Sequence, residues 1–163
     1  MAGNFASLGG AIHGSGAGIE VLMNGCTLAH NEARLGSGIY LEGCSLTWTI
    51  ENTIIAFGRD GVAIRCEDQN VTAIMSCSDV FGNERGDWVG CIAGQQGVDG
   101  NISEDPLFCD APNGDFTLRI DSPCAPAHSG GCGLIGVLPV GCGPTAVKST
   151  TWGAIKALHY NAR

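Results

Sequence analysis

The segment Gly25–Thr49, GCTLAHNEARLGSGIYLEGCSLTWT, is followed by two segments of similar length and pattern. Glu51–Met75 reads ENTIIAFGRDGVAIRCEDQNVTAIM, and Ser76–Val98 reads SCSDVFGNERGDWVGCIAGQQGV. Repeats of about 25 residues are typical of solenoid proteins, in which each copy stacks on the next. The three segments therefore predict a repeated coil.

Similar residues fall into columns when the segments are aligned. The columns are Cys26, Asn52 and Cys77; Leu28, Ile54 and Asp79; Ile39 and Ile64; Leu41, Cys66 and Cys91; and Thr47 and Thr72. An earlier partial copy, GGAIHGSGAGIEVLMN, places Ile12 near the column of Ile39. Stacked parallel coils bury such columns and pair each backbone with the coils above and below.

The apolar runs within each copy are short, often β-branched, and separated by Gly, Asn or Asp. These features are typical of strands and turns and leave no room for a helix. An antiparallel sandwich is the alternative, but it would show closely and evenly spaced turns and no columns. Asn31 and Asn83 occupy comparable turn positions, and we expect both to be structural because Asn tolerates the left-handed conformation.

Composition excludes several classes of protein. The chain has 163 residues, with 26 Gly, 15 % charged and 44 % hydrophobic residues and a formal net charge of −8. High apolar content argues against disorder, and the negative charge argues against nucleic acid or an anionic membrane as the main partner. No apolar run is long enough to span a bilayer, and the start, MAGNFASLGGAIHG, lacks the pattern of a signal peptide.

Three stretches carry a resemblance to a known family: ENTIIA, CSDVFGNERGDWVGC and GNISEDPLFCDAPNGDFTLRIDSPCAPA. They resemble the right-handed parallel β-helix family of secreted bacterial proteins, within the pectate-lyase-like superfamily. The likeness covers roughly residues 8 to 142 and implies an all-β, right-handed parallel β-helix of about four to five coils. It also implies that residues 101–124 finish the solenoid, within a closing segment at 101–142. Phe108, Phe116 and Leu118 can roof the open apolar end, because a solenoid end requires a cap.

Nine cysteines without a C-x-x-C motif favour disulfides in an oxidising compartment over a zinc site. Short loops in the cysteine-rich C-terminal third suggest Cys132–Cys142 and Cys109–Cys124 as pairs. The shared column suggests Cys66–Cys91. Cys26, Cys44 and Cys77 read instead as small buried apolar residues.

Candidate chemistry is sparse. Enzymes of this fold act on pectin, but fold does not transfer activity, and a glycan hydrolase needs two carboxylates facing one bond. Asp60, Arg65, Glu67, Asp68 and Asp79 scatter over different columns, so we expect no catalytic residue. We also expect no cofactor.

A superficial calcium-loop spacing runs from Asp99 to Asp110. The sixth position of that loop is Glu104 where glycine is required, and Pro106 interrupts its path. We therefore expect no metal.

The end of the chain differs from the rest in composition. Residues 143–163 hold both lysines of the chain and no acid, whereas residues 1–142 are acidic. A short helix with Trp152, Ile155 and Leu158 on one face would need a surface on which to dock, such as a neighbouring acidic subunit. We therefore expect residues 1–142 to form the β-helix and residues 143–163 a separate tail.

The functional expectation is a non-enzymatic structural or adhesive protein outside the cell or on its surface. Its expected partners are further copies of itself, in a homo-oligomer or a head-to-tail filament, and a cell-surface polysaccharide. The alternative is a carbohydrate-active or carbohydrate-binding β-helix. Self-association is favoured because the sequence enters the coil pattern without an amphipathic helix to cover the first coil, and an open edge pairs with another chain unless something blocks it.

Overall fold

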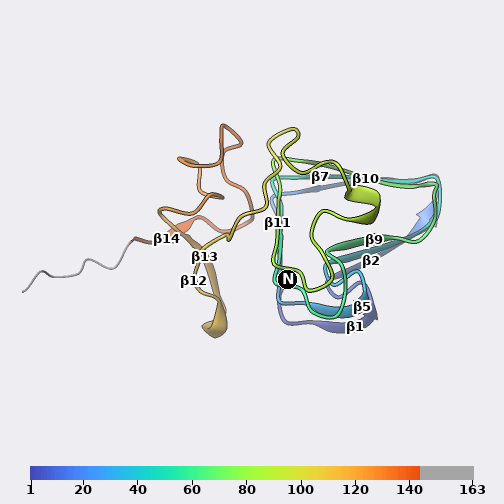
Figure 1. Ribbon diagram of the computed structural model, residues 1–163, viewed down its shortest axis with the longest axis horizontal. Coiled ribbons are helices and arrows are strands. Elements are labelled where there is room, and N and C mark those ends of the chain that lie inside the picture. The colour runs from blue at the N-terminus through green and yellow to red at the C-terminus, as the bar shows by residue number, and fades with distance from the viewer. Residues whose placement is uncertain (144–163) are drawn as a thin grey trace, which may run out of the picture.

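A computed structural model describes residues 1–143, which form an all-β parallel β-solenoid of about five turns. This confirms the predicted fold class. Its parallel sheets (Figure 1) contain β1 (Phe5–Leu8) and β5 (Glu32–Leu35); β2 (Ile12–Ala17), β6 (Ile39–Cys44) and β9 (Ile64–Cys66); β3 (Glu20–Asn24), β7 (Leu46–Glu51) and β10 (Val71–Ser76); and β4 (Thr27–Ala29), β8 (Ile54–Ala56) and β11 (Asp79–Phe81).

The register agrees with the predicted columns except between the first two full coils. Ile39 pairs with Ile64 as expected, but Thr27, and not Leu28, stacks on Ile54. The predicted column of Leu28 was therefore wrong by one residue, and Cys26 is displaced in the same way. The cause is the corner that contains β5, because the chain from Glu32 to Ile39 is longer than the matching stretch from Arg59 to Ile64.

The core is a set of apolar columns inside the stacked coils. Ile39, Leu41, Ile50 and Ile64 are fully buried there. Trp48 packs against Gly14 of the coil before it. A Cβ added at Gly14 would lie 2.8 Å from Leu41 and from the Trp48 ring. The glycine-rich first coil is thus filled by side chains from the second.

The corners of the coils depend on asparagine side chains. The Asn83 side chain accepts a hydrogen bond from the Gly58 N–H at 3.0 Å and donates one to the Ile55 carbonyl at 3.1 Å. The same two contacts join Asn31 to Asn4 and Met1, and Asn101 to Ser78 and Met75. Asn31 and Asn83 are therefore structural, as predicted. The left-handed residue is the one before each, His30 or Gly82, and not the asparagine.

The last coil is covered at its open side. Residues 82–101 contain a short 3-10 helix, η1 (Gly90–Ile92), and bury Trp88 and Ile92 against the core. The Gln95 side chain accepts from the Met75 N–H at 2.7 Å and donates to the Ala73 carbonyl at 2.8 Å. Gln95 thereby takes the place of a further strand beside β10.

The C-terminal segment packs against the side of the solenoid. Its elements are β12 (Phe108–Asp110), η2 (Ala111–Asn113), β13 (Asp115–Arg119) and β14 (Val140–Cys142), and they lie beside β11 in Figure 1. Leu118, Cys124 and Ile135 cluster with Ile54 of β8, and the Val137 N–H donates to Thr27 of β4.

These contacts run along the successive rungs of one sheet. The expectation that Phe108, Phe116 and Leu118 roof the end of the solenoid was therefore wrong. Trp88 and Ile92, which belong to residues 82–101, cover that end instead.

Candidate functional site

A cluster of ionisable side chains lies on the outer face of the sheet β2-β6-β9. The register stacks His13 on Tyr40 and Tyr40 on Arg65. His13 Nε2 lies 3.0 Å from Glu42 Oε1, and the Tyr40 hydroxyl donates to Glu42 Oε2 at 3.4 Å. Successive coils thus bring an imidazole, a phenol and a carboxylate together.

Glu67 and Arg65 extend this cluster on the third coil. Arg65 Nε lies 3.3 Å from Glu67 Oε2. Tyr40 is only 4 % exposed, although its side chain points away from the core column of Ile39 and Leu41. Burial, the charges of Glu67 and Glu42 and hydrogen bonds to them raise the pKa of Tyr40, so its hydroxyl stays protonated at neutral pH. We call these five residues, His13, Tyr40, Glu42, Arg65 and Glu67, the polar cluster.

The polar cluster contains the residue types used in general acid–base chemistry. A cavity of about 400 Å³ adjoins it, lined by Glu67 and Asp68 together with Thr72 of β10. The carboxylates of the cluster accept hydrogen bonds, and its guanidinium donates them. This combination suits ligands that are rich in hydroxyl groups.

The sequence-based candidates are only partly brought together. Arg65 and Glu67 pair, and Asp68 accepts a hydrogen bond from the Gly43 N–H at 3.3 Å. Asp60 instead pairs with Arg85 at 2.6 Å, and Asp79 is buried under the C-terminal segment. His13, Tyr40 and Glu42 were missed, although Tyr40 follows His13 at the spacing of one coil and Glu42 lies two residues beyond Tyr40 on the same strand.

The residues of the calcium-like spacing serve the backbone. Asn101 bonds to Ser78 and Met75, and the Ser103 hydroxyl donates to the Val80 carbonyl at 2.9 Å. Asp105 accepts from the Leu107 N–H at 2.9 Å. Among residues 1–143, no group of three or more His, Cys, Asp or Glu side chains is placed to hold a metal ion.

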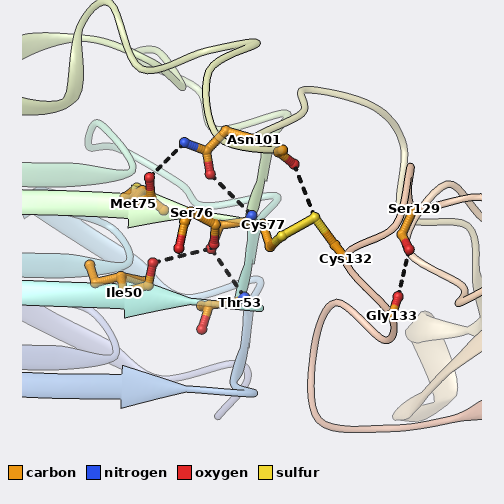
Figure 2. The surroundings of a disulfide bond; sticks show 11 residues. Ile50, Thr53, Met75, Ser76, Cys77, Asn101, Ser129, Cys132 and Gly133 are labelled. Carbon is orange, nitrogen blue, oxygen red and sulfur yellow. Dashed lines mark hydrogen bonds between the residues drawn. A yellow bond between two sulfur atoms is a disulfide. The ribbon is translucent and has the colours of Figure 1, made fainter.

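Three disulfides are formed: Cys66–Cys91, Cys77–Cys132 and Cys109–Cys142. The pairing of Cys66 with Cys91 agrees with their shared column. The pairs Cys132–Cys142 and Cys109–Cys124 are not formed, because the segment folds back on the solenoid. That path brings Cys132 to Cys77, with a Cα–Cα distance of 5.4 Å, at the end of β10 (Figure 2).

The remaining cysteines of the described chain are unpaired. Cys124 is buried, Cys44 is exposed and Cys26 is half-buried. The interpretation of Cys77 as a small apolar residue was wrong, and that of Cys44 as a buried one was also wrong. Trp152, Ile155 and Leu158 lie outside the described residues.

The first coil presents an unpaired edge. Within residues 1–143, β1, β2 and β3 each pair on one side only, with β5, β6 and β7. The Thr47 N–H bonds to the Ile19 carbonyl and the Gly25 N–H to the Glu51 carbonyl. Odd-numbered residues of β3 therefore face β7, and the N–H of Leu22 points to the open edge because the direction alternates along a strand.

Comparisons of the chain with protein-family models, with curated proteins and with solved structures gave no match. In the described part of the chain, no helix is both long and apolar enough to cross a membrane. The geometry of the site and of the coil edges therefore supplies the functional argument.

Proposed function

We propose that this chain is an extracellular structural or adhesive β-solenoid protein that associates with further copies of itself through the edge of its first coil. The observation that supports this most is the edge of β1, β2 and β3, with which no further strand of residues 1–143 pairs. Such an edge offers free backbone donors and acceptors to a second chain.

The composition of the first coil supports pairing with another copy. Soluble proteins protect edge strands with lysine, proline or bulges. Glu20 is the only Asp, Glu, Lys or Arg among residues 1–27, no lysine occurs before Lys148, and no proline occurs before Pro106. Two first coils can approach each other with little charge repulsion although the whole chain is acidic.

The covered last coil favours an arrangement in which two first coils meet. Gln95 and η1 occupy the edge of β10, so a second copy finds fewer free backbone groups there. A pair with twofold symmetry uses the same edge twice and closes. A head-to-tail filament is the alternative arrangement, and electron microscopy of the purified protein distinguishes the two.

An extracellular location fits three disulfides, which persist in oxidising compartments. In this proposal residues 1–142 form one domain, the solenoid with its C-terminal segment at 101–142, and residues 143–163 form a separate tail. The exposed sheet faces offer a surface for adhesion to a cell-surface polysaccharide.

The test is the mass of the full-length protein by light scattering, as its concentration is raised. Leu22→Pro removes one backbone donor, the N–H that points to the open edge. Proline is tolerated at such positions. Leu22→Ala removes most of the side chain but keeps the N–H, and is the matched control. We expect dimers for the natural protein and for Leu22→Ala, and monomers for Leu22→Pro. A monomeric natural protein at high concentration would contradict the proposal.

A second candidate function rests on the polar cluster: binding or cleavage of a polysaccharide on the outer face of β2-β6-β9. A screen of acidic and neutral polysaccharides for new reducing ends and unsaturated products tests it. Turnover should fall at least about 100-fold in Glu42→Gln and Tyr40→Phe if they act in proton transfer. Asp60→Asn is the control, because Asp60 pairs with Arg85 outside the cluster.

A further inference from the structure

A groove runs between a corner of the solenoid and the η2 turn of the C-terminal segment. Two adjoining cavities of about 330 and 610 Å³ form it; His30, Ala111 and Pro112 line both. Phe57 and Phe108 line the smaller cavity, and Phe5 lines the larger one. Ligand sites in proteins are commonly apolar hollows of this size.

Five aromatic rings line the groove, those of Phe5, His30, Phe57, Phe108 and Phe116. His30 stacks on Phe57 with ring centroids 5.1 Å apart, and Phe108 meets Phe116 edge to face at 5.3 Å. Phe5 is 79 % exposed at the edge of the groove. Burial, and then the charge of Arg59, lower the pKa of His30, so its ring is neutral at pH 7. These rings offer faces and edges to large apolar side chains.

Charged residues of both signs line the groove close to the point where the chain leaves the described structure. Asp105, Asp110 and Arg119 line the smaller cavity, and Glu32 and Arg59 line the larger one. Cys109 also lines the smaller cavity, and its disulfide joins it to Cys142, shortly before the segment 144–163 begins.

The two parts of the chain, before and after residue 144, carry opposite net charges. All 16 acidic residues and five of the eight basic residues precede residue 144, so that part has a formal charge of −11. The segment 144–163 carries Lys148, Lys156 and Arg163 and no acid, a charge of +3, and the two values give the −8 of the whole chain. Trp152 and Ile155 are apolar side chains within this basic segment.

We propose that residues 144–163 of the same chain dock in this groove, with Trp152 as the main aromatic anchor. Trp152 is nine residues beyond Gly143, a span of at most about 30 Å, so it can reach either cavity. The tether at Cys142 keeps the segment at a high effective concentration beside the groove, and the net negative charge of residues 1–143 attracts its lysines. Pro112 lies outside the first coil, so its substitution tests this inference separately from association through that coil.

The test is site-specific trypsin cleavage after Lys148 and Lys156 in the full-length protein, followed by mass spectrometry. Phe5→Gln and Pro112→Gln place a neutral polar side chain in the groove at exposed positions, so they weaken the apolar contact without adding negative charge. Ile74→Gln places the same side chain at a 50 % exposed position on β10 and is the matched control. We expect about tenfold faster cleavage in both groove variants, and the natural rate in Ile74→Gln. Far-UV circular dichroism checks that all three variants fold.

Further outcomes decide the assignment. If the protection of Lys148 and Lys156 from trypsin is unchanged on dilution, the groove holds the chain's own segment. If this protection is lost on dilution, the groove holds a neighbour's segment and the proposal is overturned. Equal cleavage rates in all four proteins would also overturn it. Protection should weaken with added salt, because the contact is partly electrostatic.

Fluorescence gives a second readout of the same contact. The contribution of Trp152 is the difference between each protein and its Trp152→Phe counterpart. Acrylamide should quench this contribution less in the natural protein than in Pro112→Gln, because the groove shields the indole ring. Equal quenching in the two proteins would remove Trp152 as the anchor.

Discussion

At the scale of single residues, Asp79 is a buried acid at the junction of β11 and the C-terminal segment. Its side chain is fully buried and accepts hydrogen bonds from the Glu104 N–H at 3.1 Å and the Cys124 thiol at 3.3 Å. Burial raises the pKa of Asp79 to about 7, and the nearby Asp87 and Glu104 charges act in the same direction. Burial and Asp79 also raise the pKa of Cys124, which keeps it a thiol.

The first prediction follows from this carboxyl group. Its pKa is near 3.8 in the unfolded chain, so between about pH 4 and 7 the folded protein holds a proton that the unfolded chain has lost. The free energy of unfolding should therefore fall as pH rises through this range, by at most about 4 kcal/mol. Asp79→Asn should remove that dependence and be the more stable protein at pH 8. Urea unfolding at pH 4.5, 6 and 8 measures the free energy of unfolding of both proteins, with Asp68→Asn as an exposed control.

The second prediction concerns a strained backbone at an exposed corner. Ser45 has φ of 55°, in the left-handed region that disfavours side chains. Ser45→Gly should raise the free energy of unfolding by about 0.5–1 kcal/mol, the relief of strain less the entropy of glycine. Ser15→Gly, in the extended strand β2, should lower it by about the same amount. The idea fails if both substitutions destabilise equally in urea titrations.

At the scale of structural elements, the asparagine corners hold successive coils in register. Gly58 leaves room for Asn83, since a Cβ there would meet Asn83 Oδ1 at 2.5 Å. The amide group substitutes for a turn hydrogen bond by bridging an N–H and a C=O of the preceding coil. A side chain without both a donor and an acceptor leaves at least one of these buried groups unpaired.

The third prediction is the loss of one such corner. Asn83→Ala leaves the Gly58 N–H without its partner and removes the hydrogen bond that Asn83 donates to the Ile55 carbonyl, which should cost about 1–3 kcal/mol of unfolding free energy. Asn113→Ala is the control, because Asn113 is exposed and its side chain donates to the exposed Asp110. Its cost should be below about 0.5 kcal/mol. Equal losses in guanidinium unfolding would show that Asn83 has no special role.

The columns and the strands between them were predictable because the period of the repeat reflects the stacking itself. The register of Leu28 was not, since the extra length of its coil lies in the corner of β5, where no apolar column marks it. The polar cluster was missed because His13, Tyr40 and Glu42 come from two coils and meet only when that register is known. The side packing of the C-terminal segment depends on long-range contacts within the cluster of Ile54 and Ile135, which no local pattern encodes.

At the scale of the whole molecule, the solenoid and its C-terminal segment are joined by a few defined contacts. One is the buried cluster of Ile54 and Ile135 with its neighbours. Another is the disulfide Cys77–Cys132, which joins the last coil to the segment, whereas Cys109–Cys142 lies within the segment. The first disulfide restricts detachment of the segment from the solenoid, and the second restricts unfolding within the segment.

The fourth prediction separates these two effects by hydrogen exchange. The double substitution Cys77→Ser with Cys132→Ser removes a constraint worth about 2–4 kcal/mol on detachment. Amides of β13 and β14 should then exchange at least about 30-fold faster, because the segment opens as a unit, while β7 and the core of the solenoid keep their protection. The matched pair Cys109→Ser with Cys142→Ser should accelerate exchange in β12 and β14 and leave the last coil unchanged. If both pairs speed exchange uniformly over residues 1–143, the solenoid and the segment unfold as one cooperative unit, and the two disulfides have no separate roles.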